Sequence, residues 1–454
     1  PYACELNDGF DTHEWVGRQP WCDGQVATFG VSYPGFTQTL PATLRSPHLR
    51  ALVPIASQQD NWGHHRVSGA IHWSVSLFFS NLIGRTMQTE PVALLDQATL
   101  LRHLPLVTAI EANIGRSDYY RGVIEHDRYD EWWSRYSLRD RYGEVDVPAY
   151  FMTGWYDSLL HETLTVFQGW KRGARSEEAR RLTRILVGPW SHQVAPWGRA
   201  PVGPNGEFED VTFGAHAVGD VIAEHLRWYD ARLRGRPTGI DEEPPVRLFV
   251  MGANTWRDEW EWPLARTRWT DAFLAPGGRL VIGGPPPGPD AAPDHFRYDP
   301  ADPVPSWGAQ YQSADLGGPR DRRVVEARPD VLVFDSDVLG ADLEVTGPIA
   351  VELWAATDAP DTDWTATLVD VFPDGRAIIL CEGICRQRYG RDPLAAPELV
   401  PPNTPTAYRI DLWDTSNAFL AGHRIRLEIS SSNFPRFDRN LNTGGRIGFE
   451  TEWQ

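Results

Sequence analysis

The chain has 454 residues, more than the roughly 250–300 at which one hydrophobic core stops growing, so we expect at least two domains. Its net charge of −18 at pH 7 argues against nucleic acid and anionic membranes as partners, because their phosphates would repel it. No apolar run approaches the ~20 residues of a membrane-spanning helix. Four cysteines do not make a disulfide framework, and this low number favours a cytoplasmic location.

The first 60 residues follow an α/β pattern. Residues 11–20 and 33–45 have the apolar spacing of helices, whereas Val26–Gly30 and 51–57 are short, continuously apolar strands. Strands that do not alternate and are separated by helices are typical of a parallel sheet covered on both faces. Residues 1–60 therefore indicate the first part of an α/β core.

The next segment, 61–145, changes character. Residues 72–87, 91–110 and 129–143 have helical spacing with few strand signals, which predicts a helical cap inserted into the core.

The α/β pattern returns in 146–240. Strands are predicted over Val147–Asp157 and Thr183–His192, followed by a helix over 219–235. We therefore assign 1–60 and 146–240 to one α/β-hydrolase core.

From residue 243 to 454 the helical patterns disappear. Alternating or fully apolar strands are separated by Gly, Pro and Asp turns, which is typical of a β-sandwich or jelly roll. The predicted strands are 245–256, 331–339, 345–356, 364–384, 407–413 and 423–432. The Pro/Gly-rich stretch 274–294 is predicted to be a long surface connection.

Ser32 lies directly after the first apolar strand, in the sequence Gly30-Val31-Ser32-Tyr33-Pro34-Gly35. A nucleophile elbow reads Gly-x-Ser-x-Gly and needs small residues beside the serine, because the chain turns sharply from strand to helix. Gly30 meets this need, and Pro34 fits the first turn of a helix. A serine that caps a helix after a buried strand explains this stretch equally well.

Two later residues favour the nucleophile. Asp157 and His192 each end a predicted strand, and the order Ser, Asp, His along the chain is that of α/β-hydrolases. A serine nucleophile needs a base, and the base needs an acid that orients it. We therefore predict a triad of Ser32, His192 and Asp157.

Other polar residues are weaker candidates. His161 lies on the helix after Asp157 and would face the same side as that acid, and Asp60 is an alternative acid. The run that contains His64, His65 and His72 lacks Cys or acidic partners at ligand spacing, so we predict no metal and no cofactor.

The segments 20–38, 152–158 and 185–192 resemble the three catalytic segments of the CocE/NonD hydrolase family, whose elbow reads Gly-x-Ser-Tyr-x-Gly. Residues 247–263, 368–384 and 422–445 are similar to the C-terminal jelly-roll domain of that family. The resemblance covers nearly the whole chain in order, and it implies that Ser32 is the nucleophile, His192 the general base and Asp157 the acid that orients it.

The resemblance also implies an oxyanion hole. The backbone N–H of Tyr33 would supply one donor, and a tyrosine hydroxyl before residue 1 would supply the other. By the same comparison, the first strands of the sheet precede Pro1 and further chain follows Gln454, so we expect a fragment of a longer product with an unpaired sheet edge.

We predict a small ester or amide, or a short peptide, as substrate, with Trp62, Trp73, Trp155 and Trp190 as candidate pocket residues and core packing as the alternative for each. A carboxylic ester hydrolase or acylase is favoured over an X-Pro dipeptidyl-peptidase, which must hold the free α-amine of a peptide with an acid such as Asp60, Glu111 or Asp118. A truncated inactive hydrolase and a ligand-binding module are further alternatives. The sequence neither requires nor excludes an oligomer.

Overall fold

The computed structural model of the protein describes residues 4–84, 97–111, 115–192, 206–288, 291–311 and 316–454. Part of the predicted helix 91–110 therefore lies outside the described residues.

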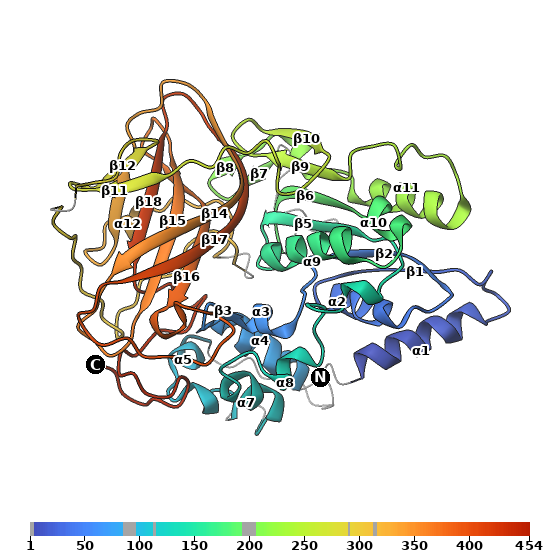
Figure 1. Cartoon of the computed structure of the whole chain (residues 1–454), viewed down its shortest axis with the longest axis horizontal. Helices are drawn as coiled ribbons and strands as arrows, with labels where there is room; N and C mark the ends of the chain where they lie inside the picture. Colours follow the sequence, from blue (N-terminus) through green and yellow to red (C-terminus); the bar gives the residue numbers. More distant parts are fainter. Residues whose placement is uncertain (1–3, 85–96, 112–114, 193–205, 289–290, 312–315) are drawn as a thin grey trace.

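The α/β part is built around a six-stranded sheet in the order β1-β2-β5-β6-β9-β10 (Figure 1). Neighbouring strands are parallel, except that β9 and β10 form an antiparallel pair. Every residue of β5 and β6 is buried, which explains why these strands read as continuous apolar runs. The strands are β1 Val26–Val31, β2 Leu49–Ile55, β5 Tyr150–Tyr156, β6 Arg184–Ser191, β9 Val246–Val250 and β10 Thr255–Glu259.

Helices connect and cover these strands. They are α1 Glu5–Gly17, α2 Tyr33–Thr39, α9 Leu160–Gly173, α10 Glu177–Leu182 and α11 Val221–Arg234, with short 3₁₀ turns at Pro41–Leu44 and Ala215–Val218. A small hairpin of β7 Glu207–Phe208 and β8 Val211–Thr212 precedes α11.

Two strands lie in a different sheet from the one predicted. Because helical patterns end before residue 243, the sequence places the predicted strand 245–256 in the second domain. In the structure, β9 pairs in parallel with β6 and extends the first sheet. Leu248, Phe249 and Val250 are buried there, so β9 has the continuous apolar pattern of an inner strand. The end of the helices in the sequence is therefore not the end of the first sheet.

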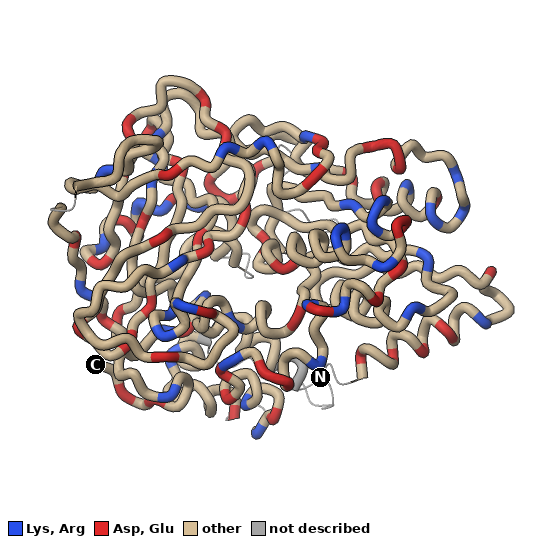
Figure 2. The backbone as a smooth tube through the Cα atoms, in the orientation of Figure 1, with Lys and Arg blue, Asp and Glu red and all other residues tan. Residues whose placement is uncertain are grey.

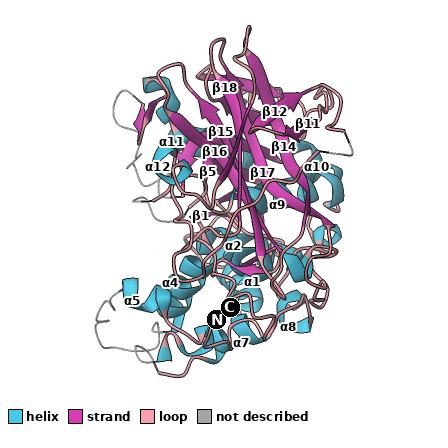
Figure 3. Ribbon diagram, turned by 90° about the vertical axis from the view of Figure 1, so that its left-hand side faces the viewer, coloured by secondary structure: helices cyan, strands magenta, loops and turns pink. Residues whose placement is uncertain are grey.

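The segment between β2 and β5 is helical, as predicted, and gathers at one end of the molecule below the strands (Figure 3). It contains α3 Asn61–His65, α4 Trp73–Gly84, α5 Gln97–Arg102, α7 Asp118–Glu125 and α8 Glu131–Ser134. A two-stranded pair, β3 Arg66–Val67 and β4 Ala70–Ile71, and short 3₁₀ turns at Leu106–Thr108 and Tyr142–Glu144 complete it.

The C-terminal part is rich in β-structure. One sheet has six strands in the order β11-β12-β13-β18-β15-β16, and β14 and β17 form a long antiparallel pair. The strands are β11 Ala272–Ala275, β12 Arg279–Ile282, β13 Leu332–Asp335, β14 Leu343–Ala355, β15 Asp363–Val371, β16 Ala377–Arg386, β17 Thr406–Phe419 and β18 Arg424–Ser430, with α12 Arg323–Glu326 and a 3₁₀ turn at Gln387–Tyr389. The predicted surface connection 274–294 thus contains part of a hairpin, because Gly277 and Gly278 adopt the positive φ of a tight turn between β11 and β12.

The two parts share one hydrophobic core. A single cluster of buried side chains runs from Phe36 and Phe151 in the α/β part to Leu368 and Phe419 in the β part. The prediction of an α/β core followed by a β-rich domain is therefore confirmed, and the two pack as one body.

The distribution of charged residues and the hydropathy of the helices match the expectations from the sequence. Figure 2 shows Lys and Arg interspersed with Asp and Glu rather than gathered into a basic face in this view. Within the described ranges, no helix is both long and apolar enough to cross a membrane.

Candidate active site

Ser32 lies on a sharp turn between β1 and α2. Its backbone angles are φ 63° and ψ −123°, a conformation that costs free energy for a residue other than glycine. The turn is held by hydrogen bonds: the Ser32 N–H donates to the carbonyl of Ile55 at 2.8 Å, and the Ser32 carbonyl accepts from the Gly35 N–H at 2.8 Å. Strained backbone held in this way is typical of a nucleophile elbow.

The two glycines around Ser32 are needed for space. A Cβ atom on Gly30 would lie 2.5 Å from the Cβ of Pro34 and 2.7 Å from its carbonyl oxygen. A Cβ on Gly35 would lie 3.1 Å from the carbonyl oxygen of Ile55, where α2 passes the end of β2. The sequence prediction that small residues allow this turn agrees with these contacts.

Asp157 and His192 form a contact at the carboxyl ends of β5 and β6. The Asp157 Oδ1 atom lies 2.9 Å from the Nδ1 atom of His192 and also accepts the Leu159 N–H at 2.7 Å. Asp157 is fully buried, and the His192 side chain is only 10% exposed. Burial by itself lowers the pKa of His192, but the negative charge of Asp157 and its hydrogen bond outweigh burial, so the pKa is raised above its ordinary value.

Ser32 reaches the same edge of the sheet. The parallel strands β1, β2, β5 and β6 are neighbours in that order, so the residues that follow their carboxyl ends gather at one edge. Within the described residues, the Ser32 hydroxyl makes no hydrogen bond. The structure therefore joins Asp157 to His192 and brings Ser32 to the same edge without a hydrogen bond to the imidazole, as is common in unliganded enzymes.

His64, which the sequence singled out only as an unlikely metal ligand, interacts with His192. It is buried, and neither of its ring nitrogens has a hydrogen-bond partner within the described residues. Its ring centroid lies 5.2 Å from that of Phe79, which in turn lies 5.7 Å from the ring of Tyr33. Burial, together with repulsion from His192, lowers the pKa of His64 to about 3, so the ring is neutral at neutral pH.

Asp60, the alternative acid, has other partners. Its carboxylate caps α3 by accepting the Gly63 N–H at 2.9 Å, and it forms an ion pair with Arg139 at 3.0 Å. Beside it lies Glu162 on α9, which accepts the N–H of Gln59 at 2.9 Å. Burial and the nearby charge of Asp60 raise the pKa of Glu162 to about 8. Nothing in the sequence pattern distinguishes this buried carboxyl from a surface glutamate on a helix.

The four candidate tryptophans are packed in the interior. Trp155 and Trp190 are buried in the shared core and donate their indole N–H groups to the carbonyls of Phe249 and Ala217. Trp73 is buried in a second cluster between the helical segment and the end of the β part, and its indole donates to Leu101. Trp62 packs edge-on against Trp133. These contacts favour core packing, the alternative that the sequence left open for each.

The histidines that the sequence also considered make packing contacts and hydrogen bonds elsewhere. His161 stacks on Trp413, with ring centroids 5.8 Å apart. His65 bonds Ser76 and Tyr119 through its two ring nitrogens. In the part of the chain that the structure describes, no group of three His, Cys, Asp or Glu side chains could hold a metal ion.

Comparison with known proteins agrees with this geometry. Residues 2–194 match the sequence family X-Pro dipeptidyl-peptidase (S15 family). Residues 238–451 match the family of the X-Pro dipeptidyl-peptidase C-terminal non-catalytic domain. A cocaine esterase from Rhodococcus sp. (strain MB1 Bresler) is 37% identical over 99% of this chain and 80% of its own length. The chain belongs to the CocE/NonD family of serine hydrolases. As a CocE/NonD hydrolase it is a serine ester hydrolase, and the S15 match keeps X-Pro dipeptidyl-peptidase as the alternative.

Two more relatives support this placement of the CocE/NonD chain. A putative serine esterase from Mycobacterium bovis is 26% identical over 95% of this chain and 75% of its own length. The solved structure of an α-amino acid ester hydrolase superposes with a TM-score of 0.85 at 25% identity, covering 99% of this chain and 76% of that one.

Proposed function

We propose that Ser32, His192 and Asp157 form the catalytic triad of a carboxylic ester hydrolase or acylase. The observation that supports this most directly is the contact between Asp157 and His192, at the sheet edge where Ser32 is held at positive φ on a strand-to-helix turn. In this arrangement Asp157 fixes the imidazole so that Nδ1 faces the carboxylate and Nε2 is available to the hydroxyl of Ser32.

The proposed reaction has two half-reactions. His192 takes the proton of Ser32 as Oγ attacks the ester carbonyl, and the resulting oxyanion is stabilised by the N–H of Tyr33, the first residue of α2. His192 then protonates the leaving alcohol, which leaves an acyl-enzyme. Water attacks this ester with His192 again as base, and the carboxylic acid leaves.

The pairing of the candidate acids favours an ester over a peptide with a free α-amine. Glu111 and Asp118 are paired with Arg121 and Arg116, and Asp60 with Arg139. Glu162 keeps its proton at neutral pH because of its raised pKa, and His64 is neutral. These groups offer little negative charge to an ammonium, so we propose an uncharged ester or amide as substrate, with X-Pro dipeptides as the second candidate.

The nucleophile is tested with a fluorophosphonate probe and with p-nitrophenyl butyrate. We expect Ser32→Ala to abolish both labelling and hydrolysis, whereas the matched control Ser134→Ala, on an exposed helix end, keeps both. Labelling that survives Ser32→Ala would remove Ser32 as the nucleophile. A faster release from Ala-Pro-p-nitroanilide than from p-nitrophenyl butyrate would favour the peptidase, and no activity on any substrate would favour an inactive or binding protein.

A cytoplasmic location is part of the proposal. The four cysteines are free thiols, two of them buried in β16, which suits a reducing compartment.

A further inference from the structure

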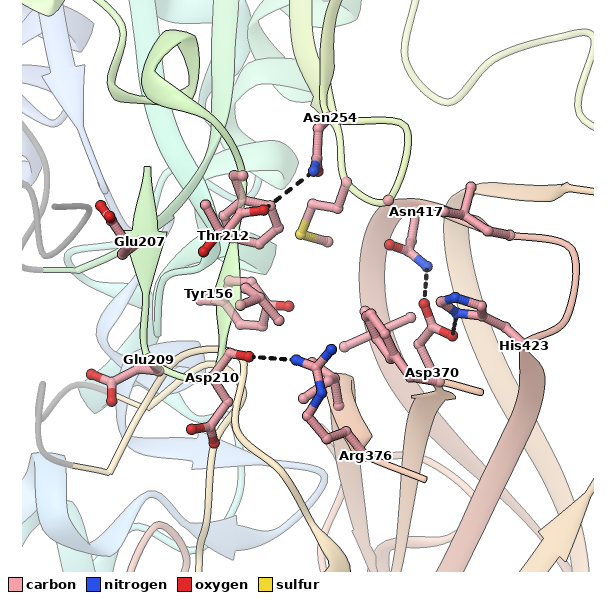
Figure 4. Close-up of a pocket in the computed structure, with 18 residues that line it drawn as sticks. Tyr156, Glu207, Glu209, Asp210, Thr212, Asn254, Asp370, Arg376, Asn417 and His423 are labelled. Carbon is pink, nitrogen blue, oxygen red and sulfur yellow. Dashed lines mark hydrogen bonds and ion pairs between the residues drawn. The ribbon is translucent and has the colours of Figure 1, made fainter. Parts of the chain in front are cut away.

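A cavity lies between the α/β part and the β part. Its volume is about 470 Å³, within the range of small-molecule sites. The β7–β8 hairpin forms one wall, and the hairpin between β15 and β16 forms the other, as Figure 4 shows. Ser32, Asp157 and His192 are not among its lining residues. The cavity is therefore separate from the proposed triad.

Arg376 presents a fixed cation to this cavity. Its Nε donates to Asp374 at 2.9 Å, its Nη1 donates to the carbonyl of Asp210 at 3.0 Å, and its guanidinium carbon lies 4.6 Å from the ring centroid of Phe372. Among the described residues, its Nη2 has no hydrogen-bond partner. In Figure 4 the guanidinium points toward the cavity. A guanidinium that is already oriented in this way loses little conformational entropy when it binds an anion.

The carboxylates that line the cavity bond to groups other than the guanidinium of Arg376. Asp370 is occupied by His423, whose Nδ1 lies 2.7 Å from Oδ1, and by Asn417 at 3.5 Å from Oδ2. The side chains of Glu207, Glu209 and Asp210 point away from the cavity in Figure 4. Glu209 pairs with Arg320 at 2.8 Å, and Asp210 Oδ2 accepts the N–H of Asp321 at 2.8 Å. Arg376 is paired with Asp374, which is not a lining residue. What Arg376 offers the cavity is therefore the open N–H donor at Nη2.

Much of the rest of the lining is apolar, with Phe213, Met251, Ile378, Leu380 and Leu420 among the walls. One further polar group is open: Asn254 Oδ1 is buried without a hydrogen-bond partner, while its amide nitrogen donates to Thr212 at 3.4 Å. Apolar walls beside the open Nη2 donor of Arg376 suit an amphipathic anion, whereas Asn254 Oδ1 would accept only from a hydroxyl or N–H group of a ligand.

We propose that this cavity binds a small organic carboxylate with an apolar body. The carboxylate accepts from Nη2 of Arg376, and the apolar body packs against Met251, Leu380 and Leu420. The occupant would touch Tyr156, whose hydroxyl donates to the carbonyl of Ile379 at 3.2 Å and whose neighbour in the chain is Asp157. It therefore bridges the two parts of the molecule, and its binding raises the melting temperature. This inference does not depend on the proposed hydrolase activity.

The test is a ¹⁹F NMR titration of the full chain with 4-fluorobenzoate, compared with 4-fluorobenzylamine, after Ser32 has been blocked with the fluorophosphonate. We expect the acid to bind and the amine not to bind. Arg376→Gln weakens binding of the acid at least tenfold, whereas the control Arg391→Gln, at a side chain that is 86% exposed, changes it less than twofold. Leu420→Trp fills the cavity but keeps Arg376, and we expect it to remove binding as well. Loss of binding in both variants is then due to the site and not to misfolding of one of them.

Equal binding of 4-fluorobenzoate by the Arg376→Gln and Arg391→Gln proteins would overturn the proposal, as would tighter binding of the amine. If the probe fails to modify Ser32, the proposed activity is contradicted. The comparison of Arg376→Gln with Arg391→Gln still tests whether 4-fluorobenzoate binds in this cavity. Binding at any other site would be the same in both variants.

Discussion

At the scale of single residues, the turn at Ser32 depends on the absence of a side chain at Gly30. An alanine there would place its Cβ 2.5 Å from the Cβ of Pro34, closer than non-bonded carbon atoms approach, so β1 and α2 must separate. We expect Gly30→Ala to lower the free energy of unfolding by about 1–3 kcal/mol, the usual cost of overpacking, and to reduce kcat by displacing the hydroxyl.

Denaturant unfolding and p-nitrophenyl butyrate kinetics measure the two effects of Gly30→Ala. Gly143→Ala is the matched control, because the nearest atom to an added Cβ there is 3.9 Å away. A Gly30→Ala protein as stable and active as the control would show that the turn tolerates a side chain.

Asp157 sets the pH dependence of the proposed base. His192 acts only when its imidazole is neutral, so the rate falls as the pH drops below its pKa, which Asp157 holds above the ordinary value. Asp157→Asn removes that charge while burial, which lowers the pKa, remains. We therefore expect the acid limb of kcat/KM to move to lower pH and kcat to fall by roughly 10⁴-fold, the scale of losing the orienting acid of a triad.

The pH–rate profile measures this shift, and Asp130→Asn provides the control. Asp130 and His126 form a similar pair at 2.6 Å on the surface, so that variant should leave the acid limb in place. An unshifted limb in Asp157→Asn would mean that another group titrates.

The candidate residues that the sequence points to are those whose proposed roles fix their place in the chain. Asp157 and His192 end strands, and Gly30 precedes a sharp turn, so order and spacing reveal them. The environments of His64, Glu162 and the four tryptophans depend on what packs against them across the fold. Spacing along the chain carries no such information. The sequence therefore left the tryptophans undecided, considered His64 only as a metal ligand, and did not identify Glu162.

At the scale of elements, the loop after β2 and helix α9 share a buried acid cluster. Asp60 is paired with Arg139, so Glu162, which is 7% exposed, is left to hold the proton. Its pKa of about 8 means that the folded protein keeps this proton at neutral pH, whereas the unfolded chain loses it above about 4.5. The unfolded state therefore binds fewer protons in that window, and stability falls as the pH rises through it.

Glu162→Gln removes this titration. We expect the stability of the variant relative to the parent to increase by about 1 kcal/mol per pH unit between pH 5 and 7.5, as measured by urea unfolding at each pH. Glu178→Gln, on the exposed face of α10, should show no such trend. A pH-independent difference for Glu162→Gln would show that this carboxyl is ionised in the folded protein.

Element type was more predictable than element partnership. The strands β5 and β6 and the helix α11 follow from apolar spacing alone, because burial on one or both faces leaves a period in the sequence. The pairing of β9 with β6 does not, since a buried strand looks the same in either sheet. Register and sheet membership are set by contacts between segments far apart in the chain.

At the scale of the whole molecule, the shared core predicts how the protein unfolds. The end of β9 bonds to β17, where the Met251 N–H donates to Ser416 at 2.9 Å, and the side chain of Gln310 donates from one amide group to Trp155 of β5 at 2.9 Å and Leu380 of β16 at 3.4 Å. Exposing either part would uncover the apolar surface of the other. We therefore expect one calorimetric transition, with equal calorimetric and van't Hoff enthalpies, despite the length of the chain.

Gln310→Leu tests the connection between the two parts. It leaves the buried carbonyl of Trp155 without this donor, which costs about 1–3 kcal/mol, so the single transition should move to lower temperature without splitting. Gln19→Leu is the control, because the Gln19 side chain donates to the carbonyl of Trp15 at the end of its own helix, at 2.9 Å. Two separate transitions in the parent protein would contradict a shared core. A split that appears only in Gln310→Leu would instead show that this one side chain couples two parts that are otherwise able to unfold independently.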